Sequence, residues 1–139
     1  MSLRTLGRLL GASLLAAPLG SLLGSMVVFP LFSEPWDMVI AILCAPVGMI
    51  VGAPFCLAGA IVIGIPATWP FRRIIFRHPR SSILAYGAIG AVIGAALWVF
   101  GGAAEPTFLA VGGLYGAASG GAWIWTLSFM REWLDPAGT

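Results

Sequence analysis

Charged side chains are scarce in this chain, and lysine is missing altogether. Only 9% of the 139 residues are charged, whereas soluble proteins carry about a quarter. The deficit comes with 60% hydrophobic residues and a mean hydropathy of +1.01, which is typical of proteins embedded in a lipid bilayer. These figures exclude a soluble globule. The net charge of +2 is also too small for a nucleic-acid-binding surface.

Residue types that carry chemistry are almost absent from the apolar parts of the sequence. The single histidine, His78, lies in a basic segment, and the two cysteines, Cys44 and Cys56, match no zinc or redox spacing. The long apolar runs hold no acidic or basic residue, which argues against a proton relay, a carboxylate-coupled transporter and an intramembrane protease of the aspartate or metal type. We therefore expect a protein that is not an enzyme, with no catalytic residue, no cofactor and no metal.

Four apolar runs follow one another along the chain, and short polar breaks separate them. Each run reaches the roughly 20 residues that a helix needs to cross the hydrocarbon layer. The pattern predicts an all-α fold, with residues 1–139 as one membrane domain and four transmembrane helices in a compact bundle. The predicted helices cover about residues 9–32, 39–65, 82–103 and 108–130.

The second apolar run, residues 39–69, is too long for one straight crossing, since 31 helical residues extend about 46 Å. Pro46 and Pro54 each remove an amide donor, so we expect a helix that is kinked at these prolines. An alternative is a broken helix between them, including Gly48 and Gly52, whose free carbonyls coordinate an ion or a substrate. The ordinary kink is the preferred interpretation.

Arginine distribution predicts the orientation in the membrane. All seven arginines fall on one side of the predicted helices, whereas the turns with Glu34, Asp37 and Glu105 contain no basic residue. Both termini are therefore expected in the cytoplasm, and the protein is expected to be multi-pass in a bacterial inner (plasma) membrane. The arginines are Arg4, Arg8, Arg72, Arg73, Arg77, Arg80 and Arg131.

The first run also resembles a secretory signal peptide, because Arg4 and Arg8 precede a short apolar stretch. The apolar run, however, continues to residue 32 without the polar start of a mature protein. We therefore expect an uncleaved first helix.

Small residues recur at helical spacing in the predicted helices. Such stripes let helix backbones approach closely where lipid is as apolar as the side chains. The glycines either pack against one another within the bundle, which we favour, or form a face on the fourth helix that docks against another protein or another copy. The candidate residues are Gly90, Gly94, Gly112, Gly116 and Gly120.

The segment 72–80 is predicted to be a basic cytoplasmic loop. Its arginines flank apolar residues, so the loop is expected to lie on the membrane surface and to bind anionic lipid headgroups or a partner protein. These arginines are Arg72, Arg73, Arg77 and Arg80.

Hydroxyl groups near the middle of the predicted helices are expected to hydrogen bond across helices, since no base lies near them to activate a nucleophile. They belong to Ser21, Ser25, Tyr115 and Ser119. The leading functional hypothesis is a non-catalytic subunit or assembly factor of a larger membrane complex. The alternative is a small homo-oligomeric channel or carrier lined by Gly, Ser, Thr and backbone carbonyls. Expected partners are membrane lipids and other membrane subunits or further copies, with no nucleic acid.

Overall fold

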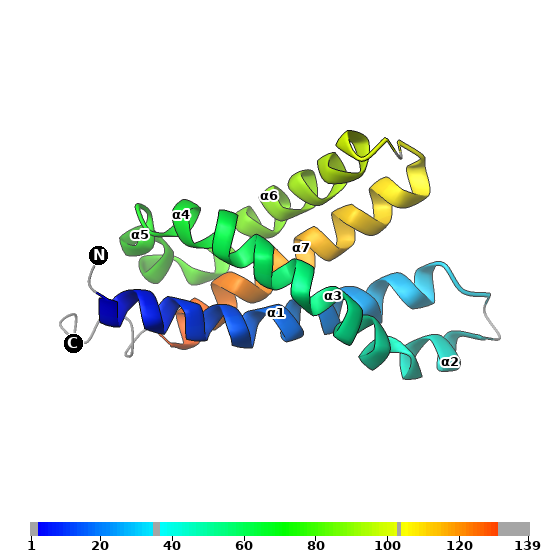
Figure 1. The fold of residues 1–139 in the computed structure, drawn as a ribbon, viewed down its shortest axis with the longest axis horizontal. Coiled ribbons are helices and arrows are strands. Elements are labelled where there is room, and N and C mark those ends of the chain that lie inside the picture. Colours follow the sequence, from blue (N-terminus) through cyan, green and yellow to red (C-terminus); the bar gives the residue numbers. More distant parts are fainter. Residues whose placement is uncertain (1–2, 35–36, 103, 131–139) are drawn as a thin grey trace.

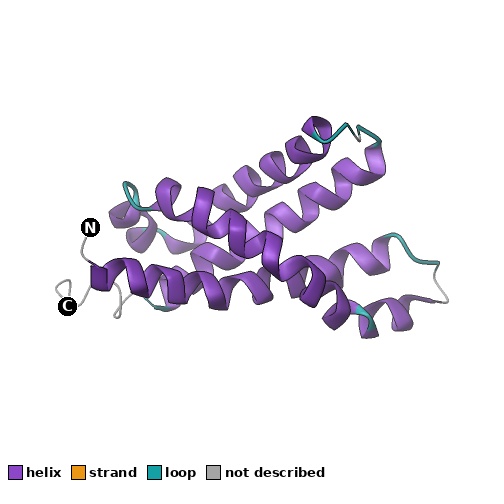
Figure 2. Ribbon diagram, viewed as in Figure 1, coloured by secondary structure: helices purple, strands orange, loops and turns teal. Residues whose placement is uncertain are grey.

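The computed structural model describes residues 3–34, 37–102 and 104–130. These residues form helices joined by short turns, and no strand occurs among them (Figure 2). The predicted all-α class is confirmed. Residue 103, at the end of the third predicted helix, and Arg131 lie outside the described residues.

The helical segments of the described chain differ greatly in length, from 29 residues in α1 to four in α4. One of them, η2, is a π-helical turn. In chain order they are α1 (Leu3–Leu31), α2 (Met38–Leu43), α3 (Ala45–Gly59), η2 (Ala60–Gly64), α4 (Ile65–Thr68), α5 (Arg72–Arg77), α6 (Pro79–Phe100) and α7 (Pro106–Phe129).

The long helices begin earlier than the hydropathy pattern predicts. The first helix begins at Leu3 instead of residue 9, the third at Pro79 instead of 82, and the fourth at Pro106 instead of 108. Proline suits the first helical turn because its φ is preset and an amide there needs no helical acceptor. Hydropathy does not report such first turns, because they also contain polar or charged residues such as Arg4, Arg80 and Thr107.

The second apolar run forms several consecutive segments instead of one helix. Cys44 separates α2 from α3, and its carbonyl accepts a hydrogen bond from the Gly48 amide at 3.2 Å. Pro46 lies in the first turn of α3, where its missing N–H cannot continue the ladder from α2. Pro54 lies within α3 without ending it, and the helical path continues through η2 to Thr68, three residues later than predicted.

The basic segment 72–80, predicted as a loop, contains the short helix α5 and the start of α6. His78 lies between the two helices. Its carbonyl accepts hydrogen bonds from the amide and the hydroxyl of Ser82, at 3.1 and 2.9 Å. This segment therefore reverses the chain through ordered helical turns.

Three stretches of the described chain are helices long and apolar enough to cross a membrane: Thr5–Leu31, Ala45–Thr68 and Pro79–Phe100. The apolar runs predict four. The remaining long helix, α7, has 24 residues, but its glycines, serines and tryptophans lower its hydropathy. By length and composition, the structure thus supports a membrane protein with three such helices.

The long helices form two hairpins. The first joins α1 to α2–α4, and the second joins α6 to α7; α1 also lies along α7 and connects the hairpins. The start of α1 and helix α5 lie at one end of the molecule, called here the arginine end, and the turns with Glu34, Asp37 and Glu105 lie at the other, the acidic end. The hairpins are together at the arginine end and diverge toward the acidic end (Figure 1).

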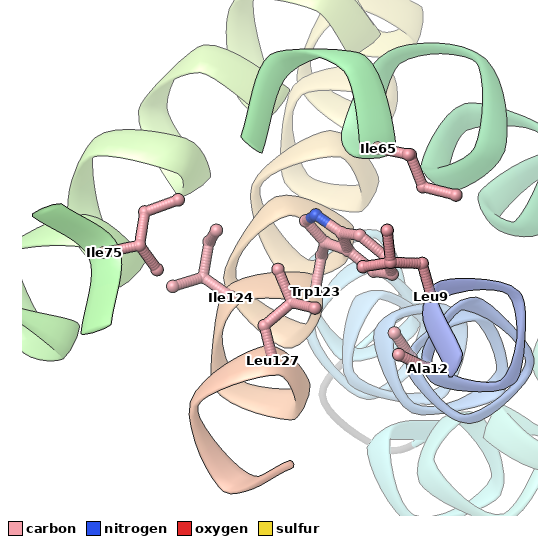
Figure 3. Packing of buried hydrophobic residues seen from close by; sticks show 8 residues of the cluster. Leu9, Ala12, Ile65, Ile75, Trp123, Ile124 and Leu127 are labelled. Carbon is pink, nitrogen blue, oxygen red and sulfur yellow. The ribbon is translucent and has the colours of Figure 1, made fainter. Parts of the chain in front are cut away.

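A cluster of buried hydrophobic residues lies at the arginine end (Figure 3). There α1, α4, α5 and α7 contribute buried side chains, and Trp123 at 3% exposure lies at the centre of the cluster. The indole N–H of Trp123 has no hydrogen-bond partner among the described residues. The cluster holds the two hairpins together. Its labelled members are Leu9, Ala12, Ile65, Ile75, Trp123, Ile124 and Leu127.

Candidate functional site

Helices α6 and α7 meet along a seam of glycines in which the backbones touch. A Cβ atom on Gly90 would lie 2.8 Å from the carbonyl carbon of Gly116, and one on Gly94 would lie 2.8 Å from that of Gly112. A Cβ atom on Gly120 would lie 3.0 Å from the carbonyl carbon of Tyr86. Real Cβ atoms do not approach backbone so closely. The five glycines singled out from the sequence therefore form one seam inside the chain, called here the glycine seam.

Side chains close the two ends of the glycine seam. Near the acidic end, Trp98 of α6 stacks on Phe108 of α7 with 4.9 Å between ring centroids. Toward the arginine end, the Tyr86 hydroxyl donates a hydrogen bond to the Ala67 carbonyl at 2.9 Å, which ties α6 to α4. The glycine faces of α6 and α7 are thus covered by each other in this structure and are not open to a partner.

A second contact region, between α1 and α3, pairs glycines with serine hydroxyls. The Ser21 hydroxyl is fully buried and lies within hydrogen-bond distance of the Gly48 and Met49 carbonyls, at 3.2 Å each. A Cβ atom on Gly52 would meet the same hydroxyl oxygen. Gly52 therefore makes the room that Ser21 needs to reach the backbone of α3.

The same region extends to α7 through Ser25 and Tyr115. The buried Ser25 hydroxyl donates to the Ser21 carbonyl at 2.9 Å, so the Tyr115 hydroxyl, 2.7 Å away, donates to Ser25. Gly24 lies under the tyrosine ring, where a Cβ atom would be 2.6 Å from Cδ1. One serine thus connects α1 to α7, while its neighbour one turn earlier connects α1 to α3.

Cys56 and Ser119 form the third polar contact, with 3.0 Å between Sγ and Oγ. They join α3 to α7, and Gly20 of α1 lies against Ser119, where a Cβ atom would be 2.8 Å from its Cα. Together these contacts define the serine cluster: Ser21, Ser25, Cys56, Tyr115 and Ser119.

Sequence reasoning identified four of the five serine-cluster residues and missed the role of Cys56. Its position could have been found, because residues 48, 52 and 56 share one face of a helix at four-residue spacing. The cluster contains hydroxyl and thiol groups but, among the described residues, no carboxylate or imidazole in hydrogen-bond contact with them. Its chemistry as described is to hold α1, α3 and α7 together.

The alternative of a broken helix requires free backbone carbonyls between Pro46 and Pro54. Two of them, from Gly48 and Met49, face the Ser21 hydroxyl. In this arrangement a serine of the same chain lies where an ion or a substrate would have to bind.

A groove of about 550 Å³ lies at the acidic end, where the hairpins diverge. The end of α1, helix α2 and the start of α7 form its walls, and Ser33, Asp37 and Thr107 are its polar lining residues. Asp37 precedes α2 but makes no side-chain capping hydrogen bond. The other lining residues are Val28, Phe29, Phe32, Ile40, Ala41, Cys44 and Val111.

A smaller cavity of about 290 Å³ lies at the arginine end, between α1, α4, α5 and the end of α7. Arg72 and Arg73 line it, whereas Arg77 and Arg80 do not. The Arg72 guanidinium lies 4.3 Å from the centroid of the Trp69 ring, and its Nη1 donates to the Trp69 carbonyl at 3.3 Å. The structure therefore separates the four predicted headgroup arginines into two that border a cavity and two outside it.

Comparison with family models, with curated proteins and with solved structures finds no match for this chain. Its function is therefore inferred from the glycine seam, the serine cluster, the groove and the cavity.

Proposed function

We propose that this chain is a non-catalytic membrane subunit or assembly factor that binds a transmembrane helix of a larger membrane complex. The observation that carries the proposal is the groove at the acidic end, which the described residues leave unfilled. The glycine faces, which the sequence offered for docking, are covered by each other, so the docking surface lies elsewhere.

The shape of the groove favours a helix as its occupant. Its walls come from both hairpins and include Phe29, Phe32 and Val111, which offer apolar surface on two sides. Its lining also includes Ser33 and Asp37. The Ser33 hydroxyl donates to the Phe29 carbonyl at 2.6 Å, so both residues can accept hydrogen bonds from a polar residue of a partner. A lipid chain could fill the apolar part but has no donor for the Asp37 carboxylate.

The proposal includes four membrane crossings in one bundle, with α7 as the fourth. Helix α7 lies against α6 along the whole glycine seam. Because α6 is long and apolar enough to span the bilayer, a helix in backbone contact with it lies at the same depth in the membrane. The second crossing bends near Cys44 and Pro46, where α2 gives way to α3. The arginine end faces the cytoplasm of a bacterial inner membrane, because positive loops are retained there.

This topology has a direct test. A cysteine placed at Thr107, on an otherwise cysteine-free chain, is expected to react with an impermeant reagent added to intact cells. A cysteine at His78 is expected to stay protected until the cells are opened. The reverse pattern would refute the proposed orientation.

Site-specific photocrosslinking tests partner binding. A photoreactive residue at Ile40 on the groove wall is expected to form a crosslink to a membrane protein of the complex, in native membranes. The matched control is Val92 on α6, which is 70% exposed against 59% for Ile40 but lies outside the groove. Equal crosslinking from both positions, or none from Ile40, contradicts the proposal. Ile40 crosslinks to a second copy would instead favour the homo-oligomeric channel or carrier.

A further inference from the structure

We infer that the cavity at the arginine end binds the phosphate of one anionic phospholipid, with Arg72 and Arg73 as its ligands. This inference depends on the proposed membrane orientation but not on the groove or its partner. Within the basic segment 72–80, Arg72 and Arg73 then form a specific phosphate site, whereas Arg77 and Arg80 belong to a general charged surface.

The lining of the cavity is amphipathic. Arg72 and Arg73 line it together with apolar residues that include Leu9, Phe76 and Leu127. At about 290 Å³, the cavity is at the lower limit of small-molecule pockets, so it accommodates a headgroup and not a whole lipid. The acyl chains would then extend along the apolar surface of the helices, into the bilayer.

The positively charged donors in the lining of the cavity come from the arginines. Two threonines, Thr5 and Thr68, also line it, and the Thr68 hydroxyl donates to the Gly64 carbonyl at 2.7 Å. Arg72 uses one N–H for the Trp69 carbonyl, which leaves four of the five guanidinium N–H groups. Because a guanidinium is planar and matches two phosphate oxygens at once, two neighbouring arginines are well suited to a phosphate diester.

The Trp69 ring holds one of these ligands in place. The cation–π contact at 4.3 Å fixes the Arg72 guanidinium at the end of α4, where the second spanning helix leaves the apolar layer. Tryptophan prefers this interfacial depth, which is also the depth of lipid phosphates. The contact therefore places a positive group at the height of the expected ligand.

Charge balance at the cavity also favours an anion. No carboxylate among the described residues lines it, and Glu34, Asp37 and Glu105 all lie in the turns at the acidic end. Glu132 and Asp135 lie outside the described residues, so the test below includes a background in which both are neutralised.

The experiment compares two double variants that each remove two positive charges from the same segment. The purified chain is exchanged into nanodiscs of phosphatidylcholine with a minor share of phosphatidylglycerol, and retained lipid is measured by native mass spectrometry. Arg72→Gln/Arg73→Gln is expected to lose the 1:1 phosphatidylglycerol adduct on the order of tenfold, as suits the loss of charge-assisted hydrogen bonds. Arg77→Gln/Arg80→Gln is expected to retain it within about twofold.

Two further variants and a soluble competitor serve as controls. Arg73→Gln alone leaves the Arg72 contact with Trp69 intact and is expected to weaken the adduct as well. Glu132→Gln/Asp135→Asn is expected to leave the adduct in place. Equal losses from the two double variants, or an adduct that survives in Arg72→Gln/Arg73→Gln, would overturn the inference. So would displacement of the lipid by millimolar glycerol 3-phosphate, which would identify a site for a soluble phosphate.

Discussion

Glycines make different contacts in the glycine seam and beside the serine cluster. Between α6 and α7, glycines admit the opposing backbone itself, so that Gly90 and Gly116 each face the other's carbonyl. Between α1 and α3, Gly48 and Gly52 admit the hydroxyls of Ser25 and Ser21. A glycine stripe therefore does not reveal its contact by itself. The residue opposite decides whether the contact is a rigid backbone or a movable side chain.

The difference matters for tolerance to substitution. A backbone carbonyl can move only if the whole helix moves, whereas a serine hydroxyl can rotate about one bond. The glycine seam should accordingly tolerate substitution less well than the glycines beside the serine cluster.

The largest effect is expected from Gly116→Ala in the glycine seam. Its new Cβ would lie 2.7 Å from the Gly90 carbonyl carbon, so α6 and α7 must separate. Overpacking of this kind costs about 1 to 3 kcal/mol. The free energy of unfolding in mixed micelles is the measurement.

Gly113→Ala is the matched control on the same helix, because its Cβ would lie 3.6 Å from the Ala91 carbonyl, an ordinary contact. It should leave the unfolding free energy almost unchanged. Equal destabilisation by both variants would mean that α7 tolerates no alanine for reasons unrelated to the seam.

A smaller effect is expected from Gly52→Ala, beside the serine cluster. The new Cβ would displace the Ser21 hydroxyl from its carbonyl acceptors, and the loss of such hydrogen bonding costs about 0.5 to 1.5 kcal/mol. Adding Ser21→Ala removes the colliding oxygen. The contact that remains, between the new Cβ at position 52 and the Cβ of residue 21, would be an ordinary 3.4 Å. The double variant should therefore be no less stable than Ser21→Ala alone in the same unfolding assay. Additive losses would show that the clash involves more than this hydroxyl.

The smallest effect concerns the hydrogen bond between Ser25 and Tyr115. A double-mutant cycle with Ser25→Ala and Tyr115→Phe should give a coupling of about 0.6 kcal/mol, the average for hydrogen bonds between membrane helices. A coupling larger than the cost of Gly116→Ala would reverse the ranking of the two regions.

The apolar pattern anticipated the helical class and the approximate place of the long helices, because burial in lipid imposes a composition on whole segments. The apolar pattern was less accurate for the residues at which the helices begin and end. Pro79 and Pro106 start helices within turns that are not apolar, and the break at Cys44 depends on which amides are missing, not on hydropathy. The glycine stripes and three of the central serines were also recognisable at helical spacing.

The amino-acid sequence is sufficient to predict a composition typical of membrane proteins, the all-α class, the separation of the arginines from the acidic turns, and the helix faces of small residues that permit close contact. The three-dimensional arrangement was needed to show which faces meet. Helix α6 meets α7 through backbone, α1 meets α3 and α7 through hydroxyls, and α3 meets α7 through the Cys56 thiol and Ser119. The groove and the division of the arginines also arise only in three dimensions. Composition and periodicity act along one helix, whereas contacts and cavities depend on the crossing of helices that are distant in the chain.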